Sequence, residues 1–270
     1  MRLSALVLVA SVAACGTDDV GDVPDDIADD GKGDGPLDPA WDSIGLGVAY
    51  REVTTGHAIV IAYGGYSARI SDSAAWASEL VDARLGAVDV GHIFAVKGPA
   101  DASYSGREIA NTKLRAHLQM IDDGVSSIYV VAHSSGSFVA HELLAQIHAT
   151  GDEALLARIS YANLDGGGSG LTLAIAETLA NLSFVYARDP IAGLSQNAGT
   201  AKSLGAAYAP HGAAFEVTVP TTGCASGAGW CLHDVVITHR PHNPSSYDLA
   251  RDYTDFVDRP VTTEYLEPFL

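Results

Sequence analysis

The sequence has few basic residues. Only 15 lysines and arginines stand against 33 aspartates and glutamates, which gives a formal net charge of −18 over 270 residues. An acidic surface repels polyanions, so this composition argues against nucleic acid as a partner and against electrostatic adhesion to anionic lipid. The chain also has no internal repeat, and no second linker divides residues 40–270. With 47% hydrophobic residues, the chain can bury the core of a full-sized domain.

Motifs for metal ions and for phosphate are also missing. His141-Glu142 begins like the zinc motif His-Glu-x-x-His, but Ala145 stands where the second histidine should be. His239 and His242 have no obvious third ligand. The glycine run at 166–168 is not followed by Gly-Lys-Ser/Thr, so it is not a phosphate-binding loop. We therefore expect no metal site.

Cysteine is scarce, and the first of the three cysteines ends a short apolar segment. Arg2 is followed by apolar residues 3–9, and Val12-Ala13-Ala14 leads into Cys15. Fifteen residues are too few to span a bilayer, so residues 1–15 are predicted to be a secretory signal peptide. The small-small-Cys ending resembles the lipobox of bacterial lipoproteins, which implies cleavage before Cys15 and a lipid anchor on it. The alternative is ordinary signal cleavage that leaves a free cysteine.

An acidic segment, 16–39, follows this signal. It contains nine aspartates, one lysine, several glycines and prolines, and no aromatic residue. Such a segment cannot bury enough apolar surface to offset its ordering entropy, so it is predicted to be a disordered tether. We expect an exported protein, either a bacterial outer-membrane lipoprotein or a periplasmic or extracellular protein. The membrane would be contacted only through the lipid on Cys15.

Cys224 and Cys231 enclose a short glycine- and serine-rich loop, CASGAGWC. Export permits disulfide formation, and small residues allow such a loop to close. We therefore expect a Cys224–Cys231 disulfide.

Strand-like and helix-like segments alternate through residues 40–270. Several of the strand-like segments are apolar at nearly every position, as in a sheet that is covered on both faces. This alternation predicts an α/β fold with a mostly parallel central sheet flanked by helices, in a single domain. The expected strands are 58–63, 92–96, 127–132, 157–163, 183–187 and 215–219. The expected helices are 72–85, 107–122, 138–149, 171–182 and 198–208.

Ser134 stands where an expected strand turns into an expected helix. The sequence Ala132-His133-Ser134-Ser135-Gly136 fits the nucleophile-elbow pattern small-x-Ser-x-Gly. A serine in this strained turn needs small residues two positions before it and two after it, and Ala132 and Gly136 satisfy that need. The helix that follows would point its N-terminus at a developing negative charge. Ser134 is therefore the candidate nucleophile.

Other candidate site residues lie at further strand ends, where ligands of parallel sheets bind. The Tyr63-Gly64-Gly65-Tyr66 turn follows the first of the expected strands. Aspartates at positions 165 and 189 follow two later strands, and either could orient a catalytic histidine. Histidines at positions 233 and 242 follow the last strand; the first is favoured as the base because the cysteine loop would hold it, and His239 ranks third.

Taken in order, the Gly-Gly turn, the serine elbow, an aspartate after a later strand and a histidine after the last strand resemble the α/β-hydrolase superfamily. The resemblance covers roughly residues 45–260 and is similar to lipase- and esterase-type members. It implies a serine hydrolase without a cofactor, with Ser134 as nucleophile, His233 as base and Asp189 as the orienting acid. It also implies an oxyanion hole built from the backbone N–H groups of Gly65 and Ser135, although Tyr63 stands where a histidine is usual.

The function expected from this resemblance is hydrolysis of carboxylic esters through an acyl-enzyme, with a small-molecule or lipid ester as substrate. We expect a monomer. The nearest alternative is a peptidase or amidase on the same scaffold. An alternative of another class is a surface lipoprotein that keeps the hydrolase fold but only binds.

Overall fold

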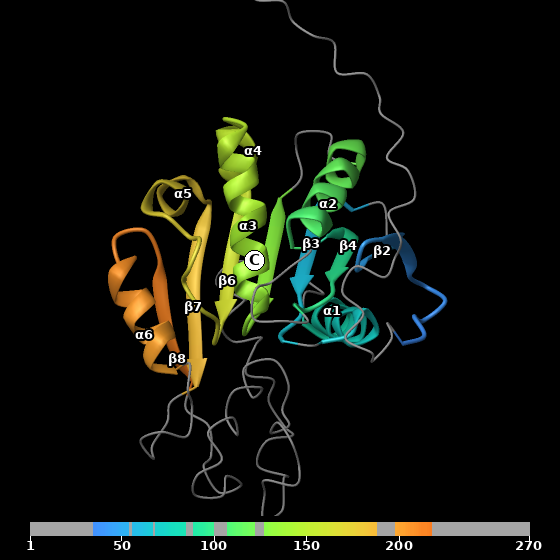
Figure 1. Cartoon of the computed structure of the whole chain (residues 1–270), viewed down its shortest axis with the longest axis horizontal. Coiled ribbons are helices and arrows are strands. Elements are labelled where there is room, and N and C mark those ends of the chain that lie inside the picture. The colour runs from blue at the N-terminus through green and yellow to red at the C-terminus, as the bar shows by residue number, and fades with distance from the viewer. Residues whose placement is uncertain are drawn as a thin grey trace, which may run out of the picture.

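The computed structural model describes residues 35–53, 56–66, 68–84, 89–99, 107–121, 127–187 and 198–217. Within these ranges, eight strands and six helices follow one another along the chain (Figure 1). The strands are β1 (Asp42–Gly45), β2 (Val48–Glu52), β3 (Ala58–Tyr63), β4 (Val90–Val96), β5 (Ile128–His133), β6 (Ile159–Leu164), β7 (Asn181–Ala187) and β8 (Ala213–Val217). The helices are α1 (Ile70–Arg84), α2 (Arg107–Ile121), α3 (Gly136–Ala149), α4 (Glu153–Leu156), α5 (Leu173–Thr178) and α6 (Ala198–Ala207).

All eight strands belong to one sheet, in the order β1-β2-β4-β3-β5-β6-β7-β8. The pairs β1–β2 and β2–β4 are antiparallel, and every other neighbouring pair is parallel. Parallel neighbours require crossover connections, which the helices between them supply. The predicted fold class, a mostly parallel sheet flanked by helices, is confirmed.

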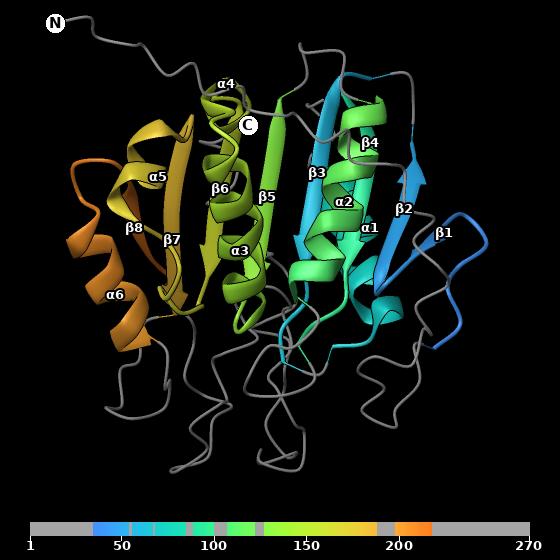
Figure 2. The same ribbon diagram turned by 45° about the horizontal axis from the view of Figure 1, so that its top comes forward.

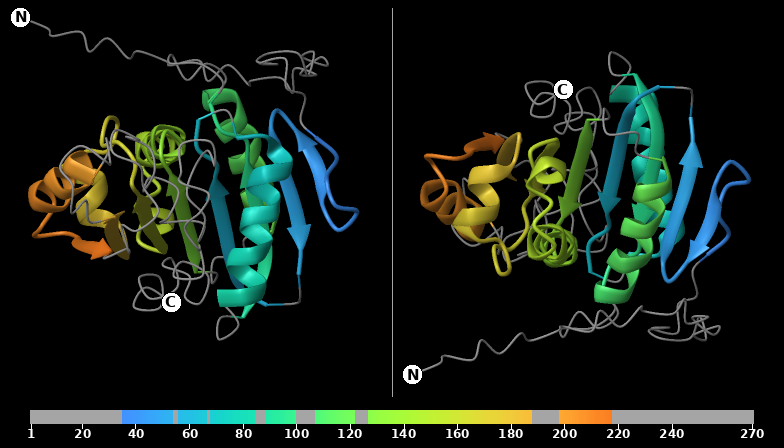
Figure 3. Two further views of the ribbon diagram at one scale, coloured as in Figure 1. Left: turned by 90° about the horizontal axis from the view of Figure 1, so that it is seen from below. Right: turned by 90° about the horizontal axis from the view of Figure 1, so that it is seen from above.

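Helices cover both faces of the sheet (Figures 2 and 3). Helix α1 packs on one face in an apolar cluster that includes Val60 and Ala62. Helices α2, α3 and α5 pack on the opposite face in a second cluster that includes Ile59, Ile61 and Tyr63. Successive side chains of a strand point to opposite faces, so β3 contributes to both clusters and is buried at all six positions.

The helix expected at 171–182 is shorter in the structure. Helix α5 begins after Thr172, whose side-chain oxygen accepts a hydrogen bond from the N–H of Ile175 at 3.3 Å, and it ends at Thr178. The chain then extends, and the Ala180 N–H donates to the carbonyl of Ile159 at 2.9 Å. Residues 179–182, which helical spacing predicts to be the end of the helix, instead lead into and begin β7, which pairs with β6.

The β1–β2 hairpin and the short helix α4 were not expected from the sequence. Gly45, Leu46 and Gly47 connect the two strands, all with positive φ angles of 86°, 57° and 73°. Glycine adopts such angles at little cost, whereas leucine does so rarely. The glycines on either side of Leu46 are the sequence signal for this turn.

Several predicted features lie outside the described residues. These are the signal segment with Cys15, most of the 16–39 tether, Asp189, Cys224, Cys231, His233, His239 and His242. Leu37, near the end of the expected tether, packs against the cluster on the α1 face of the sheet. None of the helices in the described ranges has the length and apolar character needed to cross a membrane.

Candidate active site

Ser134 occupies the sharp turn between β5, which ends at His133, and α3, which begins at Gly136. Its φ angle is +53°, in the left-handed region that serine rarely adopts. A strained residue of this kind persists only where its surroundings hold it, and such residues cluster at active sites. The side chain is 8% exposed. The predicted elbow conformation is confirmed.

Gly136 shows why the position two residues after Ser134 must be small. A Cβ atom at Gly136 would lie 2.3 Å from the carbonyl oxygen of Gly64 and 2.8 Å from that of Tyr63. Both neighbours are backbone atoms, so a side chain could be accommodated only by moving the chain. Helix α3 therefore starts in direct contact with the turn after β3.

The first turn of α3 leaves backbone donors next to Ser134. The N–H of Ser137 donates to the carbonyl of Ser134, and the N–H of Phe138 to that of Ser135. The N–H groups of Ser135 and Gly136 make no backbone hydrogen bond within the described part of the chain. Orphan N–H groups at a helix start favour negative charge. The Ser135 N–H thus belongs to a group of donors suited to an oxyanion.

Gly65 lies against the candidate nucleophile. A Cβ atom at Gly65 would be 3.2 Å from the Cβ of Ser134 and 2.9 Å from Nδ1 of His133. The turn itself is held by a hydrogen bond from the Ala68 N–H to the Gly65 carbonyl, 3.0 Å long. Residues almost seventy positions apart in the sequence are therefore brought together, as the oxyanion-hole prediction requires.

Tyr63 does not contribute its hydroxyl to this site. It is fully buried on the α2–α3 side of the sheet, and the hydroxyl donates to Oδ1 of Asn111 at 2.8 Å. Burial raises the pKa of Tyr63 well above its usual value, so the hydroxyl stays protonated. Asn111 was not among the residues predicted from the sequence. Its signal was a polar residue in helical register with the buried Leu114 and Leu118.

The opposite flank of the elbow is occupied by the glycine run after β6. Ser137 Oγ donates to the carbonyl of Ser134 at 2.7 Å and accepts from the N–H of Gly167 at 2.9 Å. Asn163 holds the same run, accepting from the Gly166 N–H and donating to the Gly167 carbonyl. The run is therefore anchored to the nucleophile turn through Ser137 and to β6 through Asn163, and both side chains are fully buried.

Asp165 lies next to this turn, at the end of β6. It is fully buried and has a φ angle of +50°. Its N–H donates to the carbonyl of Val185 at 2.8 Å. Aspartate tolerates the left-handed region better than most residues, but a fully buried aspartate in that conformation is unusual. Asp165 thus remains an acid candidate on structural grounds.

The remaining candidates for the predicted triad, apart from Asp165, lie outside the described residues. Asp189 follows the end of β7 by two residues, and His233 and His242 come after β8; all three are outside the described residues. His141 is described and lies elsewhere: its Nδ1 donates to the Ser169 carbonyl at 2.8 Å. The described ranges contain no group of three or more histidines, cysteines, aspartates or glutamates able to hold a metal ion.

The arrangement of helices and strands is similar to that of solved structures of esterases. The carboxyl esterase 2 of the mycorrhizal fungus Tuber melanosporum superposes with a TM-score of 0.52, covering 82% of this chain and 78% of that one at 8% identity. The chain has the α/β-hydrolase fold. An esterase/lipase from an uncultured bacterium is similar over 68% of this chain and 78% of that one, with a TM-score of 0.44 and 11% identity.

No protein-family model matches the sequence, and no curated protein matches it significantly. At such low identities, the structural likeness establishes the fold and nothing about substrates.

Proposed function

We propose that this chain is a serine hydrolase of carboxylic esters, with Ser134 as its nucleophile. The observation that carries the proposal is the strained conformation of Ser134 at the start of α3, with Gly65 packed against it. Strain at this position serves to hold one hydroxyl where a carbonyl carbon can approach it. The similar fungal structure is a carboxyl esterase, which is consistent with an ester as the substrate.

The reaction proceeds in two halves. His233 takes the proton of the Ser134 hydroxyl while Oγ bonds to the ester carbonyl carbon, and the N–H groups of Gly65 and Ser135 stabilise the oxyanion. The bond to the alkoxy group then breaks, and the proton passes from His233 to the departing alcohol. Water next attacks the acyl-enzyme, losing a proton to His233, and the carboxylic acid leaves as Ser134 regains its proton. Asp189 orients His233 throughout.

Two of these assignments, the base and the acid, have alternatives, which one set of variants distinguishes. His242 is the second candidate for the base, since it also follows β8 in the sequence. Asp165 is the second candidate for the acid, because Leu164, directly before it, accepts a hydrogen bond from the Ser134 N–H at 3.0 Å. Parallel His233→Ala, His242→Ala, Asp189→Asn and Asp165→Asn variants decide both. The true base and acid are those whose loss lowers kcat by several orders of magnitude.

The decisive test combines a fluorophosphonate probe with a chromogenic short-chain ester. The wild-type chain should be labelled at Ser134, and hydrolysis of the ester should begin with a burst of alcohol. Ser134→Ala should abolish both signals, whereas Ser43→Ala, on the exposed edge strand β1, should keep them. A folded chain that takes no label would overturn the enzymatic function and favour a binding protein on the same fold.

Substrate class follows from the same assay. An ester hydrolase should cleave esters faster than the matching amides, whereas a peptidase or amidase should cleave amides of suitable sequence at a comparable rate. A series of esters with increasing acyl length then distinguishes small-molecule esters from lipid esters.

We further propose export with a lipid anchor on Cys15 and a disulfide between Cys224 and Cys231. The support is the small-small-Cys ending of the apolar segment and the small residues between the two later cysteines. Metabolic labelling with a fatty acid should mark the wild-type chain and not Cys15→Ser. Thiol alkylation before and after reduction should reveal two additional thiols only after reduction.

A further inference from the structure

Three fully buried groups connect the turn after β3 to the helix after the nucleophile. Tyr63, the last residue of β3, donates its hydroxyl hydrogen to Oδ1 of Asn111 at 2.8 Å. Asn111 lies in α2 and donates through Nδ2 to the carbonyl of Val139 in α3 at 2.7 Å. Tyr63 and Asn111 are both 0% exposed. The chain of hydrogen bonds thus joins β3, α2 and α3.

Its two ends are attached to the two halves of the candidate active site. Tyr63 directly precedes the turn that contains Gly65, and Val139 lies five residues after Ser134 in the elbow helix. The start of the same helix touches the turn, since a Cβ atom at Gly136 would lie 2.8 Å from the Tyr63 carbonyl oxygen. Asn111 therefore adds a second point of attachment between the turn and the helix, one helical turn deeper in the protein.

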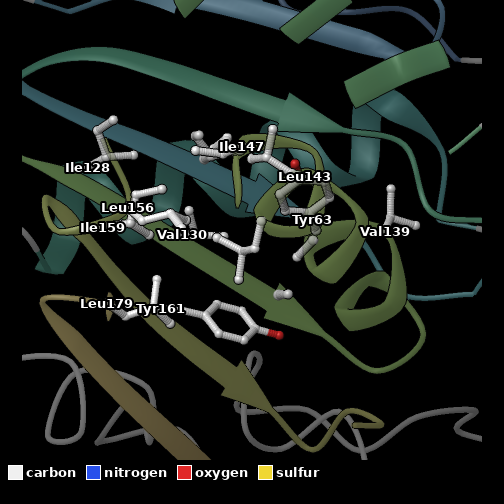
Figure 4. Packing of buried hydrophobic residues seen from close by; sticks show 14 of the residues in the cluster. Tyr63, Ile128, Val130, Val139, Leu143, Ile147, Leu156, Ile159, Tyr161 and Leu179 are labelled. Carbon is white, nitrogen blue, oxygen red and sulfur yellow. The ribbon is translucent and has the colours of Figure 1, made fainter. Parts of the chain in front are cut away.

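The surroundings of this network are otherwise apolar. Tyr63, Val139 and Leu143 belong to the cluster that fills the space between the sheet and helices α2 and α3 (Figure 4). Leu114 of α2 is part of the same cluster. A buried amide is costly unless it is hydrogen-bonded, and an apolar side chain could fill the volume. Fully satisfied buried polar groups, however, fix one arrangement where apolar packing tolerates several.

We propose that Tyr63 and Asn111 are positioning residues, which set the distance between the oxyanion turn at Gly65 and the nucleophile Ser134. The proposal rests on the proposed function. Neither side chain contacts the substrate. Their loss lets the turn move relative to the helix, so the oxyanion donors no longer meet the negative charge that develops on the carbonyl oxygen. Ground-state binding of the ester does not depend on that alignment.

The test is Tyr63→Phe, which removes one oxygen atom and nothing else, with Asn111→Ala as a second variant. Steady-state ester hydrolysis should show kcat lowered by about 10- to 100-fold, because small displacements far from the chemistry have effects of that size. KM should stay close to the wild-type value, since an interaction made only in the transition state lowers kcat and kcat/KM together. The inhibition constant of a boronic acid, which forms a tetrahedral adduct with the serine, should rise by the same factor as kcat falls.

Tyr161→Phe is the matched control. Tyr161 is also buried, at 1% exposure, and its hydroxyl is bonded to a buried side chain, Nε2 of His141, at 2.9 Å. It lies in the middle of β6 in the same apolar cluster (Figure 4). Its bond to His141 attaches α3 to β6 rather than to the turn after β3. This variant should lose stability but keep the wild-type kcat and the wild-type affinity for the boronic acid.

The outcomes are separable. If Tyr63→Phe changes kcat and boronic acid affinity no more than Tyr161→Phe does, the positioning role is wrong and Tyr63 is only structural. Should Asn111→Ala fail to fold, Tyr63→Phe decides alone. A wild-type chain that neither hydrolyses esters nor takes the fluorophosphonate label overturns the proposed function, and the positioning role with it.

Discussion

The backbone N–H of Ser134 donates to the carbonyl oxygen of Leu164 at 3.0 Å, which extends the pairing of β5 with β6 by one residue. The residue after Leu164 is Asp165, so Ser134 and Asp165 stand side by side at neighbouring strand ends. Both have positive φ angles, +53° and +50°. Apart from Leu46 in the β1–β2 hairpin, they are the non-glycine residues with positive φ in the described ranges. Strain is therefore concentrated at the edge of the sheet where the candidate nucleophile lies.

Replacement of Ser134 measures this strain directly. Ser134→Gly and Ser134→Ala both remove the hydroxyl, but only glycine adopts a φ of +53° without a steric cost. We expect Ser134→Gly to be more stable than Ser134→Ala by about 1 kcal/mol, the lower end of the cost of a left-handed non-glycine residue. Urea unfolding of the two inactive variants gives the difference.

A helical position provides the control for this comparison. Ala116 is exposed in the middle of α2, where glycine should lower stability by about 1 kcal/mol relative to alanine. The two comparisons should therefore have opposite signs. If the glycine variant is less stable than the alanine variant at both positions, Ser134 is not strained.

Gly65 should be important for activity because a Cβ atom at this position would press against His133 and Ser134. The added Cβ of Gly65→Ala would approach His133 Nδ1 to 2.9 Å and Ser134 Cβ to 3.2 Å, so the turn or the elbow must shift. Loss of one oxyanion donor costs about 100- to 1000-fold in kcat, and we expect a fall of that size in ester hydrolysis.

Gly205→Ala separates this effect from crowding in general. A Cβ atom at Gly205, in α6, would lie 2.3 Å from the Cβ of Ala214 in β8, at the far end of the sheet. This variant should unfold at lower urea concentration than the wild type and keep its kcat. If both alanine variants retain full activity, Gly65 is not part of the oxyanion hole.

Local sequence patterns were sufficient to predict most of the sheet and the elbow. The apolar run of β3 was predicted with its observed ends, because six consecutive apolar residues followed by two glycines leave little ambiguity. The strained turn at Ser134 could be predicted for a similar reason: the requirement for small neighbours is local, and the strand and helix on either side have strong patterns of their own.

The contacts that hold the site could not be predicted in the same way. Tyr63 and Asn111 are 48 positions apart, and Ser137 and Gly167 are 30 apart. Hydrophobic periodicity assigns residues to elements and faces, but it does not pair one polar side chain with another on a different element. A polar residue in register with a buried helical face, such as Asn111 with Leu114, indicates that a partner exists without indicating which one.

Ser137 and Ser183 form a matched pair that measures how much the hydrogen bonds at the elbow contribute to stability. Both are fully buried, but Ser137 Oγ bonds to the Ser134 carbonyl and the Gly167 N–H, whereas Ser183 Oγ has no hydrogen-bond partner within the described residues. Ser137→Ala removes the acceptor of the partly buried Gly167 N–H and should cost about 1–3 kcal/mol. Ser183→Ala should be close to neutral. Urea unfolding gives the stability of both variants. An equal loss of stability in the two would show that the hydrogen bonds of Ser137 do not stabilise the elbow.

His141 should make the protein less stable in mild acid. It is 0% exposed, and burial lowers its pKa from 6.5 to about 4, although its hydrogen bond to the Ser169 carbonyl acts in the opposite direction. As the pH falls below 6.5, the unfolded chain takes up a proton at His141 while the folded chain does not until about pH 4. The stability contributed by neutral His141 is therefore fully present above pH 6.5 and is lost between pH 6.5 and pH 4.

Between pH 7 and pH 5, the contribution of His141 to the free energy of unfolding falls by about 2 kcal/mol, since each pKa unit is worth about 1.4 kcal/mol. His141→Gln should start from a lower stability at pH 7, because glutamine does not reproduce both the Ser169 and the Tyr161 hydrogen bonds. Its free energy of unfolding should then fall by about 2 kcal/mol less than that of the wild type on going to pH 5.

The control is His57→Gln, which removes an exposed histidine. Its free energy of unfolding should fall as much as that of the wild type. If the unfolding free energies of the wild type and His141→Gln decline in parallel across this range, folding does not lower the pKa of His141, and the folded protein takes up a proton there over the same pH range as the unfolded chain.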